Sequence, residues 1–305
     1  MNAKKDRTDR KKIPWYIKSR MWLQALFFVI TNGYVAGFLN AKIYKGELKR
    51  ICVPGLNCYS CPGAVGACPI GALQAVISSA EYKFSCYIFG FFLVVGTLLG
   101  RGVCGFLCPF GWVQDLLYKI PLGRKKDGTK RKNLPGHKVL VWLKYVVLLV
   151  LVLLLPMLVK TEYGAGIPWF CKYLCPSGTL FGAVPLLSGD EFLRQSLGFL
   201  FSWKCFVLVV LLLLSVFFYR PFCKYLCPLG AAYGLFNSFS LFRVQVEKDH
   251  CVDCGKCHQA CPMDVDIIKH PGSPECIRCG LCVKECPTGA LSLGGERTGG
   301  KERLV

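Results

Sequence analysis

Histidine is scarce in this sequence, which has four histidines in 305 residues and none in a long apolar stretch. A haem held by two histidines inside a membrane is therefore excluded. Asp and Glu are also absent from the apolar stretches around residues 84–100, 139–159 and 203–219. Because ion and proton pumps bury such groups, the chain is not expected to pump alone. Neither a Gly-rich nucleotide fingerprint after an expected strand nor a Ser/His/Asp or zinc-protease signature is present.

Apolar residues and cysteine are present in excess. Hydrophobic residues make up 53% of the chain, which is too apolar for an ordinary soluble domain and indicates a membrane protein. The net charge is +20, but in a membrane protein Lys and Arg report topology first, so no nucleic-acid partner is expected. Twenty cysteines indicate either disulfides or metal sites, and their spacing must decide between the two.

Four apolar segments are each close to the ~20 residues that cross a bilayer as a helix. The first could be a signal peptide because a basic region precedes it, but its polar centre favours a retained helix. We therefore expect a mainly α membrane protein with four transmembrane helices and, after them, a small α+β domain. The four segments lie at about 21–40, 84–100, 139–159 and 203–219.

The basic residues predict the orientation of these helices. Residues 1–20 contain eight Lys and Arg, and the loop at 101–138 contains the run GRKKDGTKRKNLPGHK. By the positive-inside rule, both termini and this loop face the cytoplasm, whereas residues 41–83 and 160–202 face outward. We expect a multi-pass protein of a prokaryotic cytoplasmic membrane, with the basic run against anionic lipid.

The C-terminal stretch contains C-x2-C-x2-C-x3-C-P twice. This is the signature of a two-cluster bacterial ferredoxin, in which the fourth cysteine of each run ligates the other 4Fe-4S cluster. Zinc sites usually have separated cysteine pairs, and a cytoplasmic face disfavours disulfides. The predicted ligands are Cys251, Cys254, Cys257 and Cys286 for cluster one, and Cys276, Cys279, Cys282 and Cys261 for cluster two.

The chain then divides into four predicted parts. The chain enters the ferredoxin domain through the segment LFRVQVEKDH, which alternates apolar and polar residues as a strand does. The parts are a basic N-terminus at 1–20, a four-helix membrane domain at 21–240, a ferredoxin domain at 241–293 and a disordered tail at 294–305.

Three further motifs have the form C-x3-C-P-x-G, and one heptapeptide, FCKYLCP, occurs at both 170–176 and 222–228. Two of the motifs follow the second and fourth apolar segments on the cytoplasmic side. Their four cysteines suffice for one more cluster: Cys104, Cys108, Cys223 and Cys227. Arg101 and Arg220 precede these pairs at the same offset. They could offset the negative charge of a cluster or merely reach from a membrane boundary to water.

Six cysteines lie in the outward loops: Cys52, Cys58, Cys61, Cys68, Cys171 and Cys175. The Cys-rich loop at 45–80 ends in C-P-x-G, as the ferredoxin run does at Cys286, so we predict an outer cluster on the Cys52–Cys68 loop. A fifth site could join Cys171 and Cys175 with Cys86 and Cys205, unless these last two are small apolar core residues. Disulfides, or Cu(I) at Cys171 and Cys175, are the open alternatives.

The combination of C-x3-C-P-x-G motifs at membrane boundaries, four apolar segments and a two-cluster ferredoxin resembles the NapH-type membrane ferredoxins. It is also similar to the membrane part of NosR-type and CcoG-type proteins. The resemblance covers about residues 20–290 and implies electron passage between a membrane donor, often quinol, and a partner redox protein. In some relatives the context is the maturation of copper enzymes. The chain differs in its third C-x3-C-P motif at Cys171, in its four-cysteine outer loop, and in lacking a large FMN-binding outer domain.

We therefore expect a membrane-bound iron–sulfur electron-transfer protein that acts as a subunit of an oxidoreductase system rather than as a stand-alone enzyme. Its expected partners are a redox protein and, as a candidate in the membrane, quinone. One alternative is a protein that reduces, handles or senses copper with its outer thiols, using the ferredoxin domain as electron source. Another is a structural subunit that anchors a larger reductase.

Overall fold

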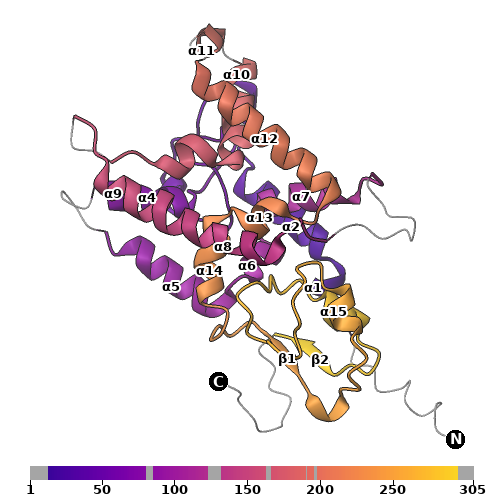
Figure 1. The fold of residues 1–305 in the computed structure, drawn as a ribbon. Helices are drawn as coiled ribbons and strands as arrows, with labels where there is room; N and C mark the ends of the chain where they lie inside the picture. Colours follow the sequence, from indigo (N-terminus) through magenta and orange to yellow (C-terminus); the bar gives the residue numbers. More distant parts are fainter. Residues whose placement is uncertain are drawn as a thin grey trace, which may run out of the picture.

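The computed structural model describes residues 13–79, 85–122, 132–162, 166–189, 191–195 and 198–294. This part of the chain is mainly helical, with one two-stranded sheet near the C-terminus (Figure 1). Most of the basic N-terminus, the centre of the basic run and the predicted tail lie outside the described residues.

The first predicted span is not one helix. It divides into α2 (Arg20–Thr31) and α3 (Val35–Leu39), preceded by α1 (Trp15–Lys18). The break follows from the polar centre of the segment, because the side chains of Thr31 and Asn32 bond back to the carbonyls of Phe27 and Phe28 and so end α2. Twelve helical residues span only about 18 Å, well short of the hydrocarbon thickness.

Only two helices in the described parts of the chain are long and apolar enough to cross a membrane. One runs over His137–Leu158 and combines α8 (His137–Val147), a π-helical stretch η3 (Leu148–Leu154) and α9 (Leu155–Leu158). The other is α12 (Phe199–Phe217). The second predicted span is the 13-residue helix α5 (Tyr87–Leu99), which is shorter than a bilayer. The four spanning helices of the prediction are thus two long helices and several short apolar ones.

Short helices surround these two and carry the cysteine motifs. Those before α8 are η2 (Glu47–Arg50), α4 (Pro69–Ser78), α6 (Gly102–Phe106) and α7 (Pro109–Lys119). Those between the long helices are η4 (Phe170–Leu174), η5 (Gly178–Ala183), α10 (Val184–Gly189) and α11 (Glu191–Gln195). After α12 come α13 (Pro221–Tyr225) and α14 (Pro228–Leu235).

The C-terminal part is a compact unit below these helices (Figure 1). The predicted entry strand is present as β1 (Val244–Val246), which pairs antiparallel with β2 (Leu291–Leu293). Between the two strands lie η6 (Lys248–His250), α15 (Lys256–Ala260) and α16 (Leu281–Glu285). The hydrophobic core of this unit includes Val244, Leu291 and Leu293, so the strands close it at the point where the chain enters and leaves.

Hydrogen bonds fix this unit against the helices. Asn237, just after α14, donates from Nδ2 to the carbonyls of Ser273 and Cys276, at 2.8 Å each. Arg278 donates to the carbonyl of Asn237 at 2.6 Å and to that of Leu99 at 3.2 Å. Both side chains are buried, so the loop that carries Cys276 is held rigidly at the ends of α5 and α14.

Candidate metal centres

The two predicted ferredoxin sites each form a cavity in the C-terminal unit. The lining of one cavity includes Cys251, Cys254, Cys257 and Cys286, which we call the first ferredoxin set. The lining of the other includes Cys261, Cys276, Cys279 and Cys282, the second ferredoxin set. Each cavity thus has the cysteines of one predicted cluster, including the crossed fourth cysteine. The donor chemistry and the hollow between the thiols fit a 4Fe-4S cluster in both places.

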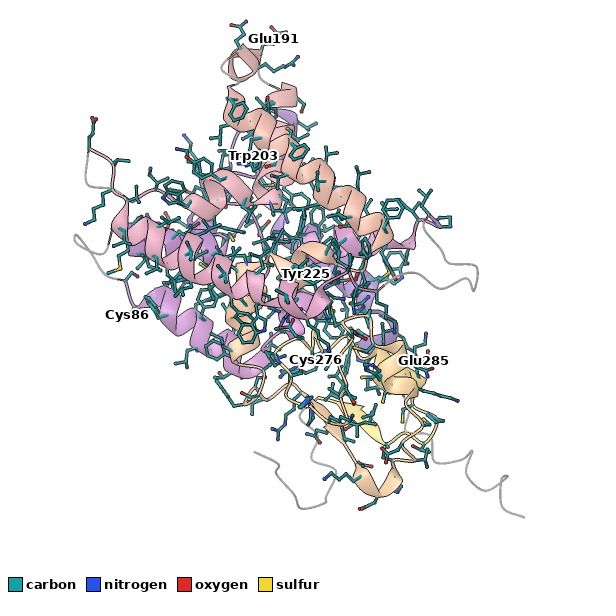
Figure 2. All side chains as sticks on the ribbon, viewed as in Figure 1. Cys86, Glu191, Trp203, Tyr225, Cys276 and Glu285 are labelled. Carbon is teal, nitrogen blue, oxygen red and sulfur yellow. The ribbon has the colours of Figure 1, made fainter. Side chains whose placement is uncertain are left out.

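The second ferredoxin set faces the helical part. Figure 2 shows Cys276 at the boundary between the C-terminal unit and the helices, in keeping with the bonds from Asn237. Burial, together with its neighbours Cys279 and Cys261, raises the pKa of the Cys276 thiol to about 12. Cys254 of the first set is exposed, whereas Cys279 of the second is buried. The second set is therefore the one closer to the membrane domain.

The C-P-x-G ending has a structural reason. Cys108 caps the N-terminus of α7, and its Sγ accepts a hydrogen bond from the N–H of Gly111 at 3.4 Å. Cys227 caps α14 and accepts in the same way from Gly230, also at 3.4 Å. Proline fills the first helical position, where no N–H partner is needed. The motif thus points backbone N–H groups at a sulfur, which favours the thiolate form.

Four thiols converge in the core, and we call Cys104, Cys108, Cys223 and Cys227 the inner set. All four are buried and belong to one core cluster. Burial, together with the neighbouring thiols of Cys108 and Cys104, raises the pKa of Cys223 to about 12. The pKa of Cys227 is raised well above its usual value by burial and by all three other thiols. Such thiols lose their protons only beside a strong positive charge, as bound iron would provide.

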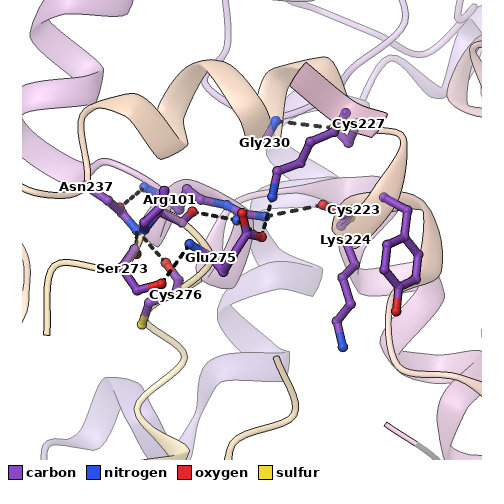
Figure 3. Close-up of polar contacts among 12 residues, drawn as sticks. Arg101, Cys223, Lys224, Cys227, Gly230, Asn237, Ser273, Glu275 and Cys276 are labelled. Atoms are coloured by element: carbon purple, nitrogen blue, oxygen red, sulfur yellow. Dashed lines mark hydrogen bonds and ion pairs between the residues drawn. The ribbon is translucent and has the colours of Figure 1, made fainter. Parts of the chain in front are cut away.

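Two arginines tie the halves of the inner set together. Nη1 of Arg220, which precedes Cys223, donates to the carbonyl of Cys104 at 2.5 Å. Nη2 of Arg101, which precedes Cys104, donates to the carbonyl of Cys223 at 3.2 Å (Figure 3). Both side chains are 0% exposed, which contradicts the interpretation that they reach from a membrane boundary to water.

The glycines of the two motifs make room for these arginines. A Cβ on Gly111 would lie 3.1 Å from Nη1 of Arg220, and one on Gly230 would lie 3.3 Å from Nη2 of Arg101. Each C-P-x-G glycine is therefore packed against the arginine of the opposite motif. The glycine that ends each motif thus has two roles: its N–H donates to the cysteine sulfur, and its lack of a side chain leaves room for the arginine of the other motif.

Each arginine has a carboxylate partner that the sequence did not reveal, and the first of the two, Asp115, is buried. Asp115 accepts from Nε of Arg220 at 2.7 Å and from its Nη2 at 2.5 Å, and also from Arg20 at 3.0 Å. Burial opposes the charge on Asp115, but Arg220 and Arg20 outweigh it and lower the pKa of the carboxyl. Asp115 lies one turn after Gly111, and this proximity to the motif was the only sequence signal.

Glu275 is the partner of Arg101, at 3.1 Å, and also pairs with Lys144 of α8 (Figure 3). Burial opposes the charge on Glu275, but Arg101 and Lys144 together outweigh it and lower the pKa of its carboxyl. Its position directly before Cys276 could have signalled a role. One charge network thus joins the inner set, a long apolar helix and the second ferredoxin set.

The backbone contacts between the inner set and the second ferredoxin set are close. Nη1 of Arg101 donates to the carbonyl of Pro274 at 2.7 Å. Nζ of Lys224, next to Cys223, donates to the carbonyl of Pro262 at 3.0 Å. A Cβ on Gly105 would lie 2.4 Å from the carbonyl oxygen of Ile277. The loops of the two sets are therefore in direct contact.

Comparison with known proteins agrees with these sites. The 4Fe-4S binding domain family matches residues 84–130, 143–190 and 200–247, and the 4Fe-4S dicluster domain family matches residues 243–287. An uncharacterized protein of Methanocaldococcus jannaschii is 30% identical over 206 residues, covering 66% of this chain and 67% of that protein. The ferredoxin-type protein NapH of Haemophilus influenzae is 25% identical over 59% of this chain and 53% of its own length.

The chain belongs to the NapH-type family of 4Fe-4S proteins. The methylamine utilization ferredoxin-type protein MauN of Paracoccus denitrificans is a further relative, 34% identical over 60% of this chain and 56% of that protein. The chain spans about half to two thirds of the length of these three relatives. No solved structure matches it. Its cofactors are 4Fe-4S clusters, which accept and release single electrons when bound.

The outer thiols of this NapH-type protein are arranged differently from the prediction. Cys61 points its Sγ toward Oδ1 of Asn32, at 3.5 Å, and the backbone N–H of Cys52 donates to the hydroxyl of Tyr87. Within this loop, Cys58 is near both Cys61 and Cys68. Cys58 and Cys68 also lie near Cys171 and Cys175, because the loop folds onto the segment around η4 and η5.

The structure does not bring the hypothetical fifth site together. Cys86 is exposed at the start of α5, and Figure 2 shows it at the margin of the molecule. Cys205 lies on α12, two residues after Trp203, which the same figure shows far from Cys86. Because Cys86 is exposed, it is also not the small apolar core residue that the alternative interpretation expected.

All twenty cysteines have free thiols in this structure. Among residues whose placement is described, no three His, Cys, Asp or Glu side chains come close enough to hold a single metal ion. The two ferredoxin sets share this property, although their family match indicates a multi-iron cofactor.

Proposed function

We propose that this chain carries electrons across the membrane domain, between its cytoplasmic ferredoxin domain and a redox partner in the membrane or on its outer face. The partner is a redox protein, with quinone as a membrane-soluble candidate. The chain would serve as an electron-transfer subunit of an oxidoreductase system. The observation that carries the proposal is the contact between the inner set and the second ferredoxin set, made by Arg101.

A gradation of burial among the thiol sets supports a relay. The first ferredoxin set is the most exposed, the second lies at the boundary with the helices, and the inner set is buried among them. Gly105 and Ile277 bring the last two sets into backbone contact. At this junction Asp115 pairs with Arg220 and Arg20, and Glu275 pairs with Arg101 and Lys144, so that each carboxylate joins two basic side chains. Such a series of closely spaced sites suits the transfer of single electrons.

Orientation rests on the two long helices and the basic residues. The basic loop at 101–138, just before α8, and the residues after α12 would face the cytoplasm, as would both termini, so that the ferredoxin domain lies there. Residues between α9 and α12 would face outward. Four-iron sites at the inner face then connect a soluble cytoplasmic domain to a domain buried in lipid.

Iron and sulfide analysis tests this assignment. If the inner set holds a cluster, anaerobically purified Cys227→Ser loses about four irons per chain relative to the parent. The EPR signals of the ferredoxin domain are retained, which also shows that the variant is folded. Cys86→Ser, at an exposed thiol remote from every set, is the control and keeps the parental iron content. A parental content of about eight irons, unchanged in Cys227→Ser, would refute the proposal.

A further inference from the structure

We propose that Cys58, Cys68, Cys171 and Cys175, here called the outer set, bind a further 4Fe-4S cluster next to the inner set. The grouping differs from the loop site that the sequence predicted, because two of its cysteines come from each outward loop. The inference rests on the proposed function only for the role of the site and not for its existence.

The four thiols of the outer set are mutual neighbours. The sulfurs of Cys58 and Cys175 both face Gly178, whose Cβ, if present, would lie 3.5 and 3.9 Å from them. The other three thiols are all close enough to Cys171 to raise its pKa in addition to burial. Cys58 and Cys68 likewise raise the pKa of Cys175, and Cys58 raises that of Cys68. Every pair within the set is therefore close, as in the inner set.

The backbone around two of these thiols repeats the arrangement of the inner set. Cys68 is the N-cap of α4, with Pro69 at the first position, as Cys108 is for α7, although no backbone N–H at the start of α4 bonds to the Cys68 sulfur as that of Gly111 does to Cys108. The pKa of Cys68 is raised to about 12, chiefly by burial, and the nearby backbone of Gly71 and Ile70 lowers it. The backbone of Gly178 lowers the pKa of Cys175 in the same way. The C-P-x-G motif thus places the following backbone beside a sulfur in both sets.

A cation faces the outer set, which suits thiolates around iron. Lys204 of α12 acts on the thiols of Cys58, Cys171 and Cys175, and in each case opposes the effect of burial on the pKa. The glycines at 178 and 182 lie against Cys58, since a Cβ on either would meet its sulfur at contact distance, 3.5 Å. Four thiols, small neighbours and a positive charge therefore coincide at one place.

A three-residue segment joins the outer set to the inner set. The backbone of Leu56 faces the thiol of Cys108 in the inner set, and the backbone of Asn57 faces the thiol of Cys68 in the outer set. The next residue is Cys58 itself. Because two residues of chain span at most about 7 Å, the sets are adjacent.

The joining segment is buried and anchored. Ser177, between Cys175 and Gly178, donates from Oγ to the carbonyl of Leu56 at 3.4 Å. A Cβ on Gly55 would lie 3.2 Å from Cα of Cys108, so the loop is pressed against the inner motif. Irregular backbone at membrane depth is tolerated where protein buries it, and Leu56 and Asn57 are buried. The outer set would extend the series of sites beyond the inner set.

The experiment compares cysteines of one loop. Purified anaerobically, Cys68→Ser and Cys175→Ser should each lose about four irons per chain, whereas Cys52→Ser and Cys61→Ser keep the parental content. Cys227→Ser reports the inner set in the same series. If Cys227→Ser loses iron but Cys175→Ser does not, the outer site is wrong and the proposed function stands. If neither loses iron, both are wrong.

A second variant keeps every cysteine in place. Gly178→Leu puts a side chain between Cys58 and Cys175 and should also lose about four irons, while the ferredoxin EPR signals remain. Gly90→Leu is the matched control, because nothing lies within 4 Å of a Cβ at Gly90. Copper bound by the outer set in place of iron, disulfides among its cysteines, or iron loss in Cys52→Ser and Cys61→Ser instead would overturn the inference.

Discussion

Arg220 donates a hydrogen bond to the carbonyl of Cys104, and Arg101 returns the same contact to Cys223. Each C-x3-C-P-x-G motif is thus completed by the arginine of the other, although more than a hundred residues separate them. The two half-sites depend on one another for their fold. An isolated motif would expose a buried arginine and lose the partner of its carboxylate.

Breaking the Asp115 network should destabilise the whole membrane domain. Asp115→Asn leaves Arg220 and Arg20 as buried cations without an anionic partner, a loss on the order of 3–5 kcal/mol. The midpoint of thermal unfolding in detergent should fall clearly. Glu47→Gln breaks the exposed pair with Arg50 and should leave the midpoint unchanged. Equal midpoints for Asp115→Asn and the parent would show that the network is dispensable.

The repeated heptapeptide offers a matched pair of lysines. Lys224 is fully buried and holds the carbonyl of Pro262, beside Cys261, whereas Lys172 at the equivalent position of the first copy is exposed. Lys224→Met should loosen the ferredoxin domain and speed its proteolytic release, because carbonyls of two segments lose their donor. Lys172→Met should not. Similar proteolysis rates for the two variants would contradict the docking role of Lys224.

The junction between the inner and second ferredoxin sets should be sensitive to one methyl group. Gly105→Ala would place Cβ 2.4 Å from the carbonyl oxygen of Ile277, so the two loops must separate. Rapid-mixing kinetics should then show slower electron exchange between the ferredoxin domain and the inner set, with all iron retained. Gly90→Ala, on the open face of α5, should cost nothing and gain about 0.5–1 kcal/mol of helix stability. Unchanged kinetics in Gly105→Ala would count against this junction.

Gln114 should tune the inner set without being part of its ligand shell. Its Nε2 donates to Sγ of Cys223 at 3.1 Å, and such bonds stabilise the more negative, reduced state of a thiolate site. Gln114→Leu should lower the reduction potential of the inner set by roughly 40 mV, for a bond worth about 1 kcal/mol. A redox titration followed by EPR measures this. The potentials of the ferredoxin domain serve as internal controls, and an unshifted inner potential would rule out the tuning role.

Local spacing predicted some features well and others poorly. Both ferredoxin sets lie within one short segment, so their cysteine spacing predicts a cavity for each set, and the structure has both cavities. The inner set was also predicted, because the orientation of the flanking segments places the two motifs on one side. The sequence is therefore enough to predict which cysteines group together when the grouping depends on spacing within one motif or on the orientation of the flanking apolar segments.

The missed features depend on contacts between distant segments. Asp115 and Glu275 have no motif of their own, and only the fold shows which arginine each one meets. The outer thiols were grouped by their loop, whereas the structure pairs Cys58 and Cys68 with cysteines more than a hundred residues later. Thr31 and Asn32 were recognised as polar, but their ability to end α2 depends on bonds to its own carbonyls. A hydropathy profile cannot show these hydrogen bonds, so it predicted one continuous helix.

Electron transfer across a sealed membrane tests the central claim most directly. The protein is reconstituted into liposomes that contain ferricyanide, and dithionite is added outside, where it meets the ferredoxin domains that face outward. The account predicts bleaching of the trapped ferricyanide with the parent chain, and none above empty liposomes with Cys227→Ser, whose ferredoxin domain is still reduced. Bleaching by Cys227→Ser at the parental rate, or none with the parent, would contradict it.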